Sequence, residues 1–415
     1  MPLEKVTVIA GGSTLGSGYG REYDEWETVV IENDAQVGYV NALLTTTEVT
    51  PIGANTQSAF DKWAFPPGTP IEIYANGDMV CNTIVWQYVP TADASQHNIT
   101  LYCKSQSFNL SVSSIVSEAG GSYENQSVRQ IIGDWAQRSG VRVLQFGDDP
   151  VIPFWQIRQG GTGYEEALRM IKSRKKLLFG MMDGSIAISD GQAMGAQGPV
   201  VQGENILRMT GRLTDMQFDF NTTLGQQNIG TDLKNDIQAH GEANTNTPGS
   251  ALSRRFKTII EPAFIDNQAA LERSDWERRR AFGATTEAIV VVPGWHAPTG
   301  VSYVTSTGQQ TPPSGGPLWQ LMADTYIYAP WLKINCVLRA VRVVFKQSQG
   351  EGSTTELTLQ DPVAFAGMSG APCDNGAMWN PGFNPLGQYM PGFEDEIWDR
   401  MMRYFGNQGG GIGHM

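Results

Sequence analysis

Residues 269–295, AALERSDWERRRAFGATTEAIVVVPGW, indicate one long charged helix joined directly to a buried strand. Asp275 and Arg279 are spaced to pair across one helical turn, and Gly283 can take the left-handed conformation that ends the helix. Residues 285–292 are almost wholly β-branched or apolar, and the Pro-Gly-Trp that follows stops the strand. We therefore expect a charged helix that leads straight into a buried strand.

The length and composition favour a β-rich chain of several domains. The 415 residues suffice for two to four domains, and 47 Gly with 22 Pro indicate many turns. Four cysteines are widely spaced and lack a CxxC pair, which indicates neither a zinc site nor a disulfide framework. These are Cys81, Cys103, Cys336 and Cys373. The apolar run after Lys5 is too short for a signal peptide, and no segment approaches the roughly 20 apolar residues of a membrane anchor. Reduced, intracellular synthesis is the simplest interpretation.

The charge of the chain argues against a surface that binds nucleic acid. The formal net charge is −13, and dense basic clusters occur only at 172–176 and 278–280. Sequence-specific binding would require a basic face to contact phosphates. We expect no such face.

The first hundred or so residues are predicted to form strands and hairpins. Residues 71–74 and 79–81 flank Asn76-Gly77, a strong signal for a type I′ turn, and residues 26–32 suit a further strand. Short strands joined by tight turns predict a small closed or nearly closed β-barrel.

Residues 120–190 are predicted to form a compact α/β module. Apolar residues recur at helical spacing behind one capping box formed by Ser127 and Gln130 and a second formed by Thr162 and Glu165. Strand signals return afterwards, with polar stretches at 241–250 and 305–316 and no internal repeat evident. The strands are expected at 205–212, 216–220, 256–260, 319–328, 335–346 and 354–359.

Several groups of residues suggest chemistry, and each has a simpler structural explanation. The glycine-rich residues 11–22 could approach a phosphate, but a strand rather than a helix follows and no GK[ST] is present. Asp148 and Asp149, or the acids at 394–396, could supply an acid–base pair for glycan hydrolysis, yet adjacent acids are usually solvated. His296 follows the Trp295 turn and is expected in an exposed loop. We assign no catalytic, cofactor-binding or metal-binding residue.

Five motifs occur in the order found in baseplate hub proteins of contractile-tailed, Mu-like phages, and the joint at 269–295 resembles the one before the last strands of that family. The motifs are GREYDEWETVVIEN (20–33), FPPGTPIEIYANGDMVCNTIV (65–85), YENQSVRQIIGDWAQRSGVRV (123–143), GTGYEEALRMIKSRKKLLFGMMDGSIAIS (161–189) and QGENILRMTGRLTDMQFD (202–219). Each motif alone has low specificity, whereas five in order are specific. The match spans roughly residues 20 to 365. The stretch 305–316 is longer than the usual turn of the family, and residues 363–415 extend beyond its last strand.

The resemblance implies a mainly β fold with two similar small antiparallel β-barrels, like those of tail tubes, plus an inserted α/β module. The implied segments are a first barrel at 1–115, the module at 116–195, a second barrel in two parts at 196–250 and 285–362, a connecting strand and helix at 251–284, and a C-terminal extension at 363–415. It also implies a structural protein without enzymatic activity, and three copies around one axis that together present six barrels.

The implied partners follow from this symmetry. Six similar barrels can meet a hexameric tail-tube or tube-initiator protein, whereas the three-fold axis can meet a trimeric central spike protein. Wedge proteins and the tape measure protein are further expected partners. The homotrimer would leave a bore for DNA passage, which an acidic protein suits because like charge prevents sticking to phosphate. The expected location is the tail baseplate of the virion, assembled in the host bacterial cytoplasm.

Other classes of function remain open. The hub of a non-contractile tail or of a phage-derived contractile injection device would share the same barrels, and a tail-associated glycan hydrolase could be built on the same scaffold. No needle-like β-helix repeat follows the barrels, and residues 363–415 are too few for a lysozyme-sized domain. These features favour a hub.

The C-terminal extension carries the one predicted partner interface. A helix expected at 394–405 has acids in its first turn and one apolar stripe, and this stripe defines the interface. The stripe residues are Ile397, Trp398, Met401, Met402 and Phe405. Two interpretations remain open, because the stripe could cap the second barrel of the same chain or dock on an adjacent subunit, the spike or the tube.

Overall fold

The computed structural model is mainly β. It describes residues 4–11, 21–23, 26–47, 65–92, 97–115, 120–158, 160–213, 235–239, 257–261, 276, 280, 286–298, 303–304, 310–311, 315–332 and 334–365. Within these residues, no helix is long and apolar enough to cross a membrane. The expectation of a mainly β fold is confirmed.

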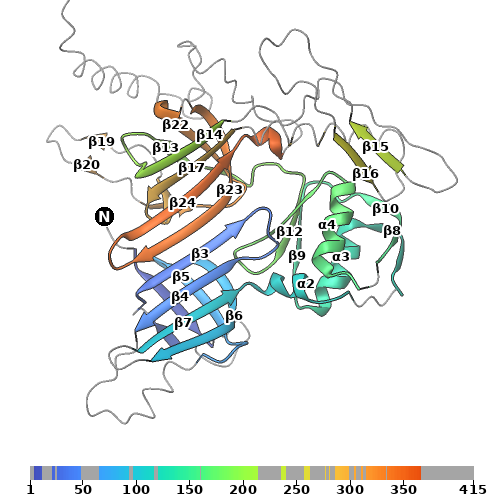
Figure 1. Ribbon diagram of the computed structural model, residues 1–415, viewed down its shortest axis with the longest axis horizontal. Helices are drawn as coiled ribbons and strands as arrows, with labels where there is room; N and C mark the ends of the chain where they lie inside the picture. Colours follow the sequence, from blue (N-terminus) through green and yellow to red (C-terminus); the bar gives the residue numbers. More distant parts are fainter. Residues whose placement is uncertain are drawn as a thin grey trace, which may run out of the picture.

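Thirteen of the described strands form one large sheet (Figure 1). Its strands are β1 (Val6–Ala10), β2 (Arg21–Tyr23), β3 (Thr28–Asp34), β4 (Asn41–Thr47), β5 (Pro70–Ala75), β6 (Asp78–Ala92), β7 (His97–Lys104), β13 (Ala196–Val201), β14 (Arg208–Leu213), β17 (Thr286–Pro293), β22 (Asp324–Ala329), β23 (Ile334–Ser348) and β24 (Gly352–Gln360). They lie in the order β14-β17-β24-β23-β3-β4-β7-β6-β5-β1-β2, and β22 pairs with both β23 and β13.

Smaller elements complete the described chain. The helices are η1 (Gln106–Phe108), α2 (Asn109–Val112), α3 (Val128–Arg138), α4 (Gly163–Ser173), η2 (Pro330–Leu332) and η3 (Pro362–Ala364). The remaining strands pair as β8 (Ser122–Ser127) with β10 (Val151–Gln156), β9 (Val143–Phe146) and β11 (Leu177–Gly180) with β12 (Ile186–Ser189), β15 (Asn235–Ala239) with β16 (Lys257–Glu261), β18 (His296–Pro298) with β21 (Gly315–Leu318), and β19 (Tyr303–Val304) with β20 (Gln310–Thr311).

An internal repeat organises the large sheet. The first strand set places β1, β5, β6, β7, β4 and β3 side by side, and the second strand set places β13, β22, β23, β24, β17 and β14 in the equivalent order. The long strands β6 and β23 each have 15 residues, and their pairing with the next strand shifts register at one bulge, between Val85 and Gln87 or between Ala340 and Arg342. The sequence had indicated no repeat. The single difference in direction is that β1 runs antiparallel to β5 whereas β13 runs parallel to β22.

Strand β23 joins the two sets. Along one side it pairs with β24, and along the other its first half pairs with β22 and its second half, from Arg342 to Ser348, pairs with β3. Figure 1 shows the orange pair β23 and β24 running beside the blue strand β3. One hydrophobic core accordingly contains residues from both sets, including Ile31, Leu101, Val290 and Phe345.

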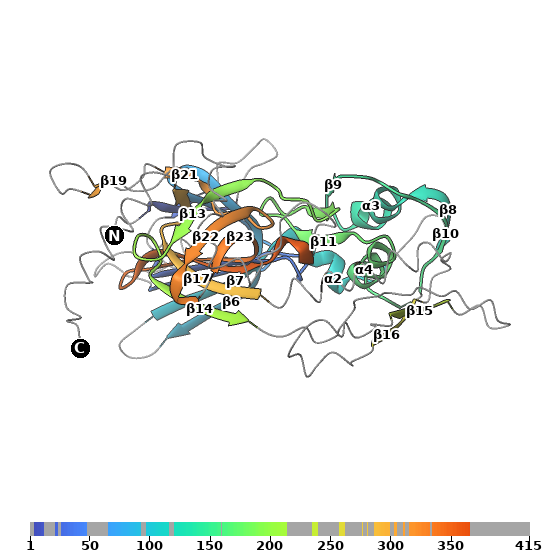
Figure 2. The same ribbon diagram turned by 90° about the horizontal axis from the view of Figure 1, so that it is seen from above.

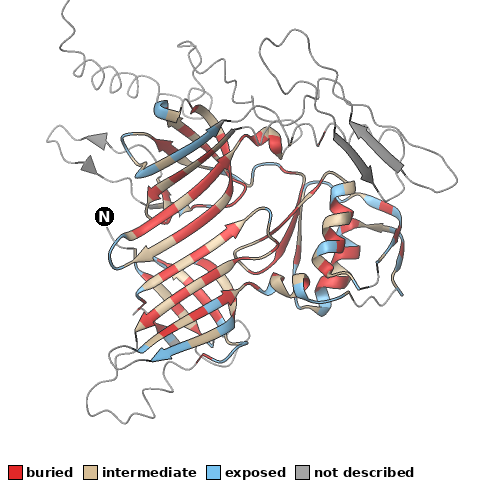
Figure 3. Cartoon of the chain, viewed as in Figure 1, coloured by how far each residue is buried: buried red, intermediate tan, exposed pale blue. Residues whose placement is uncertain are grey.

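Local sequence signals explain several elements. Asn76 and Gly77 have φ angles of 50° and 96°, so the expected tight turn joins β5 to β6. Along β3 and β4 every second residue is buried, and Figure 3 shows this alternation as bands of red and tan. Both expected capping boxes are present at the starts of α3 and α4.

The helical segment, residues 120–190, has a hydrophobic core of its own. Ile131 and Trp135 of α3 pack with Met170 of α4 and with residues of β8 to β12. Figures 1 and 2 agree in placing this segment to one side of the two strand sets. Its strand β12 runs parallel to β9 and antiparallel to β11.

Some expectations differ from the structure or lie outside it. The described strands form an open sheet rather than a closed barrel. The strand expected at 319–328 is shorter, because β22 begins only at Asp324. Of the helix expected within 269–284, the structure describes only Trp276 and Arg280, both helical, with the guanidinium carbon of Arg280 4.7 Å from the centroid of the indole. Residues 216–220 and 241–250 lie outside the described residues.

Cysteine chemistry also differs from the expectation. Cys336 in β23 is disulfide-bonded, which the sequence spacing did not predict. Cys81 and Cys103 are free and buried in the core of the first strand set.

A buried arginine connects the second strand set to the turn that follows the helical segment. The guanidinium of Arg339 in β23 is fully buried and donates two hydrogen bonds to the carboxylate of Asp324 in β22, of 2.7 and 3.1 Å. A third hydrogen bond runs to the carbonyl oxygen of Gly191, just beyond β12. Bidentate pairing of this kind offsets the cost of burying the charge.

We predict that Arg339→Ala lowers the free energy of unfolding by about 3–5 kcal/mol, because Asp324 would lose its partner in a largely buried place. Urea denaturation followed by tryptophan fluorescence measures this change. Arg342→Ala is the matched control in the same strand. Its side chain is 35% exposed, so about 1 kcal/mol or less is expected. Equal losses in the two variants would contradict the prediction.

Candidate functional site: the joint between the strand sets and the exposed strand edges

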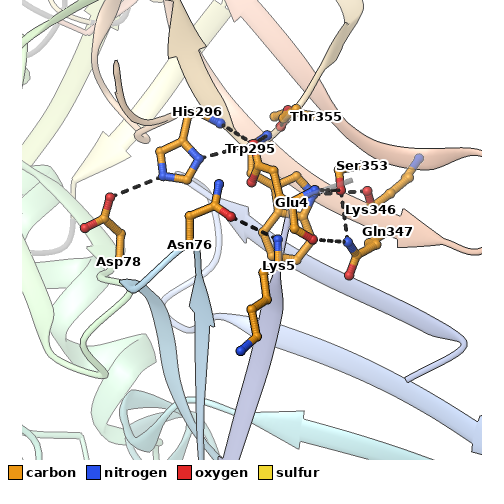
Figure 4. Close-up of polar contacts among 11 residues, drawn as sticks. Glu4, Lys5, Asn76, Asp78, Trp295, His296, Lys346, Gln347, Ser353 and Thr355 are labelled. Carbon is orange, nitrogen blue, oxygen red and sulfur yellow. Dashed lines mark hydrogen bonds and ion pairs between the residues drawn. The ribbon is translucent and has the colours of Figure 1, made fainter. Parts of the chain in front are cut away.

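Glu4, at the start of the described chain, joins the two strand sets (Figure 4). Its Oε1 accepts hydrogen bonds from the backbone N–H groups of Trp295 (2.7 Å) and His296 (3.3 Å), in the turn after β17. Its backbone N–H donates to Ser353 Oγ of β24 (3.2 Å), and its carbonyl accepts from Gln347 Nε2 of β23 (2.8 Å). One residue next to β1 is therefore bonded to three places in the second strand set.

His296 lies between two carboxylates of the first strand set. Its Nδ1 is 3.2 Å from Glu4 Oε1, and its Nε2 is 3.2 Å from Asp78 Oδ2 at the start of β6. The side chain is only 10% exposed, so the expectation of an exposed loop residue is wrong. Because the partners lie 292 and 218 positions away, no local pattern around His296 indicated this role.

Trp295 anchors the same turn in the core. Its ring is fully buried against Phe345, with ring centroids 5.4 Å apart, and its Nε1 donates to the carbonyl oxygen of Lys346 (3.0 Å). Gly294 before it has φ of 76°, and its carbonyl accepts from Thr355 Oγ1 (2.6 Å). This satisfied indole and hydrogen-bonded turn hold the Glu4 contacts in place.

A second joint connects the first strand set to the helical segment. Gly38, in the turn between β3 and β4, lies directly against the ring of Tyr164 in α4. A Cβ atom added at Gly38 would lie 2.2 Å from that ring, so only glycine fits at this position. The hydroxyl of Tyr164 donates to the carbonyl oxygen of Gln36 (3.2 Å), and the Gly180 N–H donates to that of Val37 (3.3 Å). Burial, with Asp34 nearby, raises the pKa of Tyr164, so its hydroxyl keeps the proton that it donates.

Paired charges run across the exposed face of the large sheet. Arg342 of β23 lies 2.6 Å from Glu32 of β3 and 3.5 Å from Glu356 of β24. Lys346 and Arg208 lie 2.9 and 3.5 Å from the same Glu356. These cations each have a carboxylate within 3.5 Å, so this part of the face is not a basic surface for phosphate.

Large apolar side chains are exposed in two places beside strands of the large sheet. Trp86 in β6 is 53% exposed, and Tyr102 in β7 lies close to it in the strand register. Leu207, just before β14, and Trp331 in η2 are 46% and 77% exposed. The next residue of η2, Leu332, lies against Gly211 of β14. Exposed apolar groups at strand edges are typical of protein interaction surfaces.

The described residues hold no obvious reaction centre. No group of three or more His, Cys, Asp or Glu residues among them could hold a metal ion. Burial raises the pKa of Cys103 to about 12 and that of Cys81 further, which makes both thiols poor nucleophiles. Asp149 accepts a hydrogen bond from the Arg129 N–H at the start of α3 (3.1 Å), a structural role. The acids at 394–396 and the predicted interface residues Ile397, Trp398, Met401, Met402 and Phe405 lie outside the described residues.

We predict that Glu4→Ala lowers the free energy of unfolding by about 1.5–3 kcal/mol, since two backbone N–H groups lose a charged acceptor. Hydrogen exchange at the amides of Trp295 and His296 should become faster. Glu4→Gln keeps an acceptor oxygen and should lose less than Glu4→Ala. Glu351→Ala is the control on an exposed residue, with a change within about 0.5 kcal/mol. Unchanged exchange at both amides in Glu4→Ala would contradict the role of the joint.

Comparisons with known proteins agree on the fold. No family model and no curated protein matches the chain. Among solved structures, the 43 kDa tail protein of prophage MuSo2 from Shewanella oneidensis is 20% identical with a TM-score of 0.66, and the match covers 87% of this chain and 99% of that one. A tail protein from Neisseria meningitidis is 15% identical with a TM-score of 0.58, covering 87% of this chain and 98% of that one.

Both structures are similar to this chain over nearly their whole length. At such low identity this similarity concerns the fold, and the five ordered motifs of the sequence agree with it. The chain therefore has the fold of the tail proteins of Mu-like prophages.

Proposed function

We propose that the chain is the structural hub of a contractile phage tail baseplate, a homotrimer that adapts the six-fold tail tube to the three-fold central spike. The observation that carries the proposal is the repeated set of six strands within one chain. Three copies of a chain with two equivalent sets supply six similar surfaces around one axis, while the true symmetry remains three-fold. The fold similarity to prophage tail proteins supports the same assignment.

The two joints suit an adaptor that transmits force. Glu4, Trp295 and His296 connect the strand sets, and Tyr164 against Gly38 connects the helical segment to the first set. A connector between tube and spike must transmit force without internal movement, which such buried, hydrogen-bonded contacts favour. In this proposal each strand set corresponds to one of the two tube-like barrels that the resemblance implies, while its described strands form part of an open sheet, with the segment boundaries given above and the α/β module inserted between the two sets.

The proposed partners are a second and a third copy of the chain, a trimeric spike protein and a hexameric tube or tube-initiator protein, with wedge and tape measure proteins beside them. The assembled ring, in the virion baseplate, would leave a bore for DNA. The paired charges around Glu356 and the net charge of −13 support passage of DNA without binding. The hub of a non-contractile tail or of a phage-derived injection device is the alternative, because the same strand sets would serve there.

A structural, non-enzymatic role is part of the proposal. It is supported by the fold similarity to tail proteins and by the raised thiol pKa values in the core. A tail-associated glycan hydrolase, the remaining alternative, would require an acid–base pair, and Asp149 is bonded to the start of α3 instead.

The assembly is tested by its mass. We expect light scattering to give three times the 45.3 kDa mass of the chain, alone or with co-expressed spike protein, because obligate rings bury large surfaces and persist best with their partners. Dilution of the sample provides the control for concentration-dependent association. A monomer or dimer under both conditions would contradict the hub.

The C-terminal residues 363–415 are proposed to contribute a docking arm through the stripe Ile397, Trp398, Met401, Met402 and Phe405. Deletion of 374–415 removes the stripe and keeps all four cysteines, and it is expected to abolish assembly with spike or tube while the melting temperature of the remaining chain stays unchanged. Size-exclusion chromatography and thermal unfolding measure both effects. A clearly lower melting temperature would instead indicate that the stripe covers the second barrel of its own chain.

A further inference from the structure

Two strand edges of the repeat lie exposed. From Val89 to Ala92, β6 pairs with β7 on one side, and no other described strand pairs with these residues. Strand β14 pairs only with β17 among the described strands and forms one end of the sheet. Pro90, Thr91 and Ala92 are exposed, as are Thr210 and Gly211. Such edges offer backbone groups to a further strand.

The repeat gives each edge an equivalent inside the chain. Trp86 is the residue at the bulge of β6, and Val341 is the residue at the bulge of β23, so the two occupy equivalent positions. Counting three to six residues onward, residues 89–92 of β6 are equivalent to residues 344–347 of β23. The pairing registers then lead from β7 through β4 to β3 in the first set, and from β24 through β17 to β14 in the second set. By these registers, residues 209–212 of β14 are equivalent to residues 29–32 of β3. In the chain, residues 29–32 of β3 pair antiparallel with 344–347 of β23.

We propose that β14 of one copy pairs antiparallel with the second half of β6 of a neighbouring copy, as β3 pairs with β23 within the chain. The equivalence sets the register, with Met209 opposite Ala92, Thr210 opposite Thr91, Gly211 opposite Pro90 and Arg212 opposite Val89. This inference rests on the proposed homotrimer and names the surface through which its copies meet.

The residue types fit this register. Pro90 offers no N–H, so the paired strands have one ladder hydrogen bond fewer at this position, but Gly211 opposite it has no side chain to collide with the proline ring. Thr91 and Thr210 would form a cross-strand pair of a favourable type. Phe345 and Ile31, the equivalent residues of the second half of β23 and of β3, are fully buried where those strands meet.

Apolar side chains beside the two edges support the same contact. Trp86 precedes the free part of β6 by three positions. Leu207 immediately precedes β14, and Trp331 is followed by Leu332, which lies against Gly211 of β14. Trp86, Leu207 and Trp331 are among the large apolar side chains most exposed in the described chain. A contact between two different surfaces of one chain is head-to-tail, so repeated copies close into a ring when the rotation allows it.

Engineered disulfides test the contact and its register. Two differently tagged full-length copies are co-expressed, one with Thr91→Cys or Val89→Cys and the other with Thr210→Cys or Arg212→Cys. Opposite residues in an antiparallel pair lie within disulfide reach, whereas diagonal residues lie mostly beyond it. We expect 91 with 210 and 89 with 212 to cross-link under oxidation, with about a tenfold larger cross-linked fraction than 91 with 212 or 89 with 210.

The two tags and the control samples show whether a cross-link joins two copies in the proposed register. Six strands lie between β14 and β6 in the sheet order, so a bond between these positions joins two copies, and the two tags identify such products on non-reducing gels. The parent chain and each variant alone report background from the native cysteines. A trimer in light scattering without in-register cross-links, or with equal cross-linking of all four pairs, would overturn the strand pairing and leave the proposed function intact. A monomer without cross-links, both alone and with co-expressed spike protein, would remove both.

Discussion

The antiparallel pairing of β3 with the second half of β23 is the contact on which the rest of the structure depends. It turns two sets of six strands into one sheet, and it lets residues of both sets share one core. Without it, Val29 and Ile31 of β3 would lie at an open sheet edge. The Glu4 joint adds polar contacts at the end of the same seam, because Gln347 and Ser353 belong to β23 and β24. Backbone pairing therefore sets the arrangement, and the buried polar contacts hold it in one position.

Local features could be predicted from the sequence because their causes are local. The Asn76-Gly77 turn requires two left-handed residues, and both capping boxes combine a side chain and an amide only three positions apart. The order of five motifs also led to the fold that the comparisons support. In each case the physical requirement is met within a few residues, so one window of sequence contains all the information.

The repeat was implied only by the resemblance to baseplate hubs, and the joint could not be predicted at all, because their determinants are distant in the sequence or differ in residue size. Pro90 and Phe345 occupy equivalent places, as do Gly211 and Ile31, yet the two residues of each pair differ strongly in size and shape. What they share is register, which follows from backbone pairing and one bulge in each set. His296 was expected in a loop because its neighbours resemble a turn, whereas its environment is set by Glu4, 292 residues earlier. Such long-range contacts leave no periodic pattern in a single sequence.

The sequence separation between β3 and β23 has a consequence for how the chain folds during synthesis. Strand β3 is made some 310 residues before its partner, so its edge stays uncovered for roughly 15–60 seconds at about 5–20 residues per second. During that time the strand presents alternating apolar residues, Val29 and Ile31, to any other extended chain. The nascent first strand set is thus an aggregation hazard that ends only when the second set emerges, and slow translation or chaperone capture of residues 28–34 would decide the yield of folded protein.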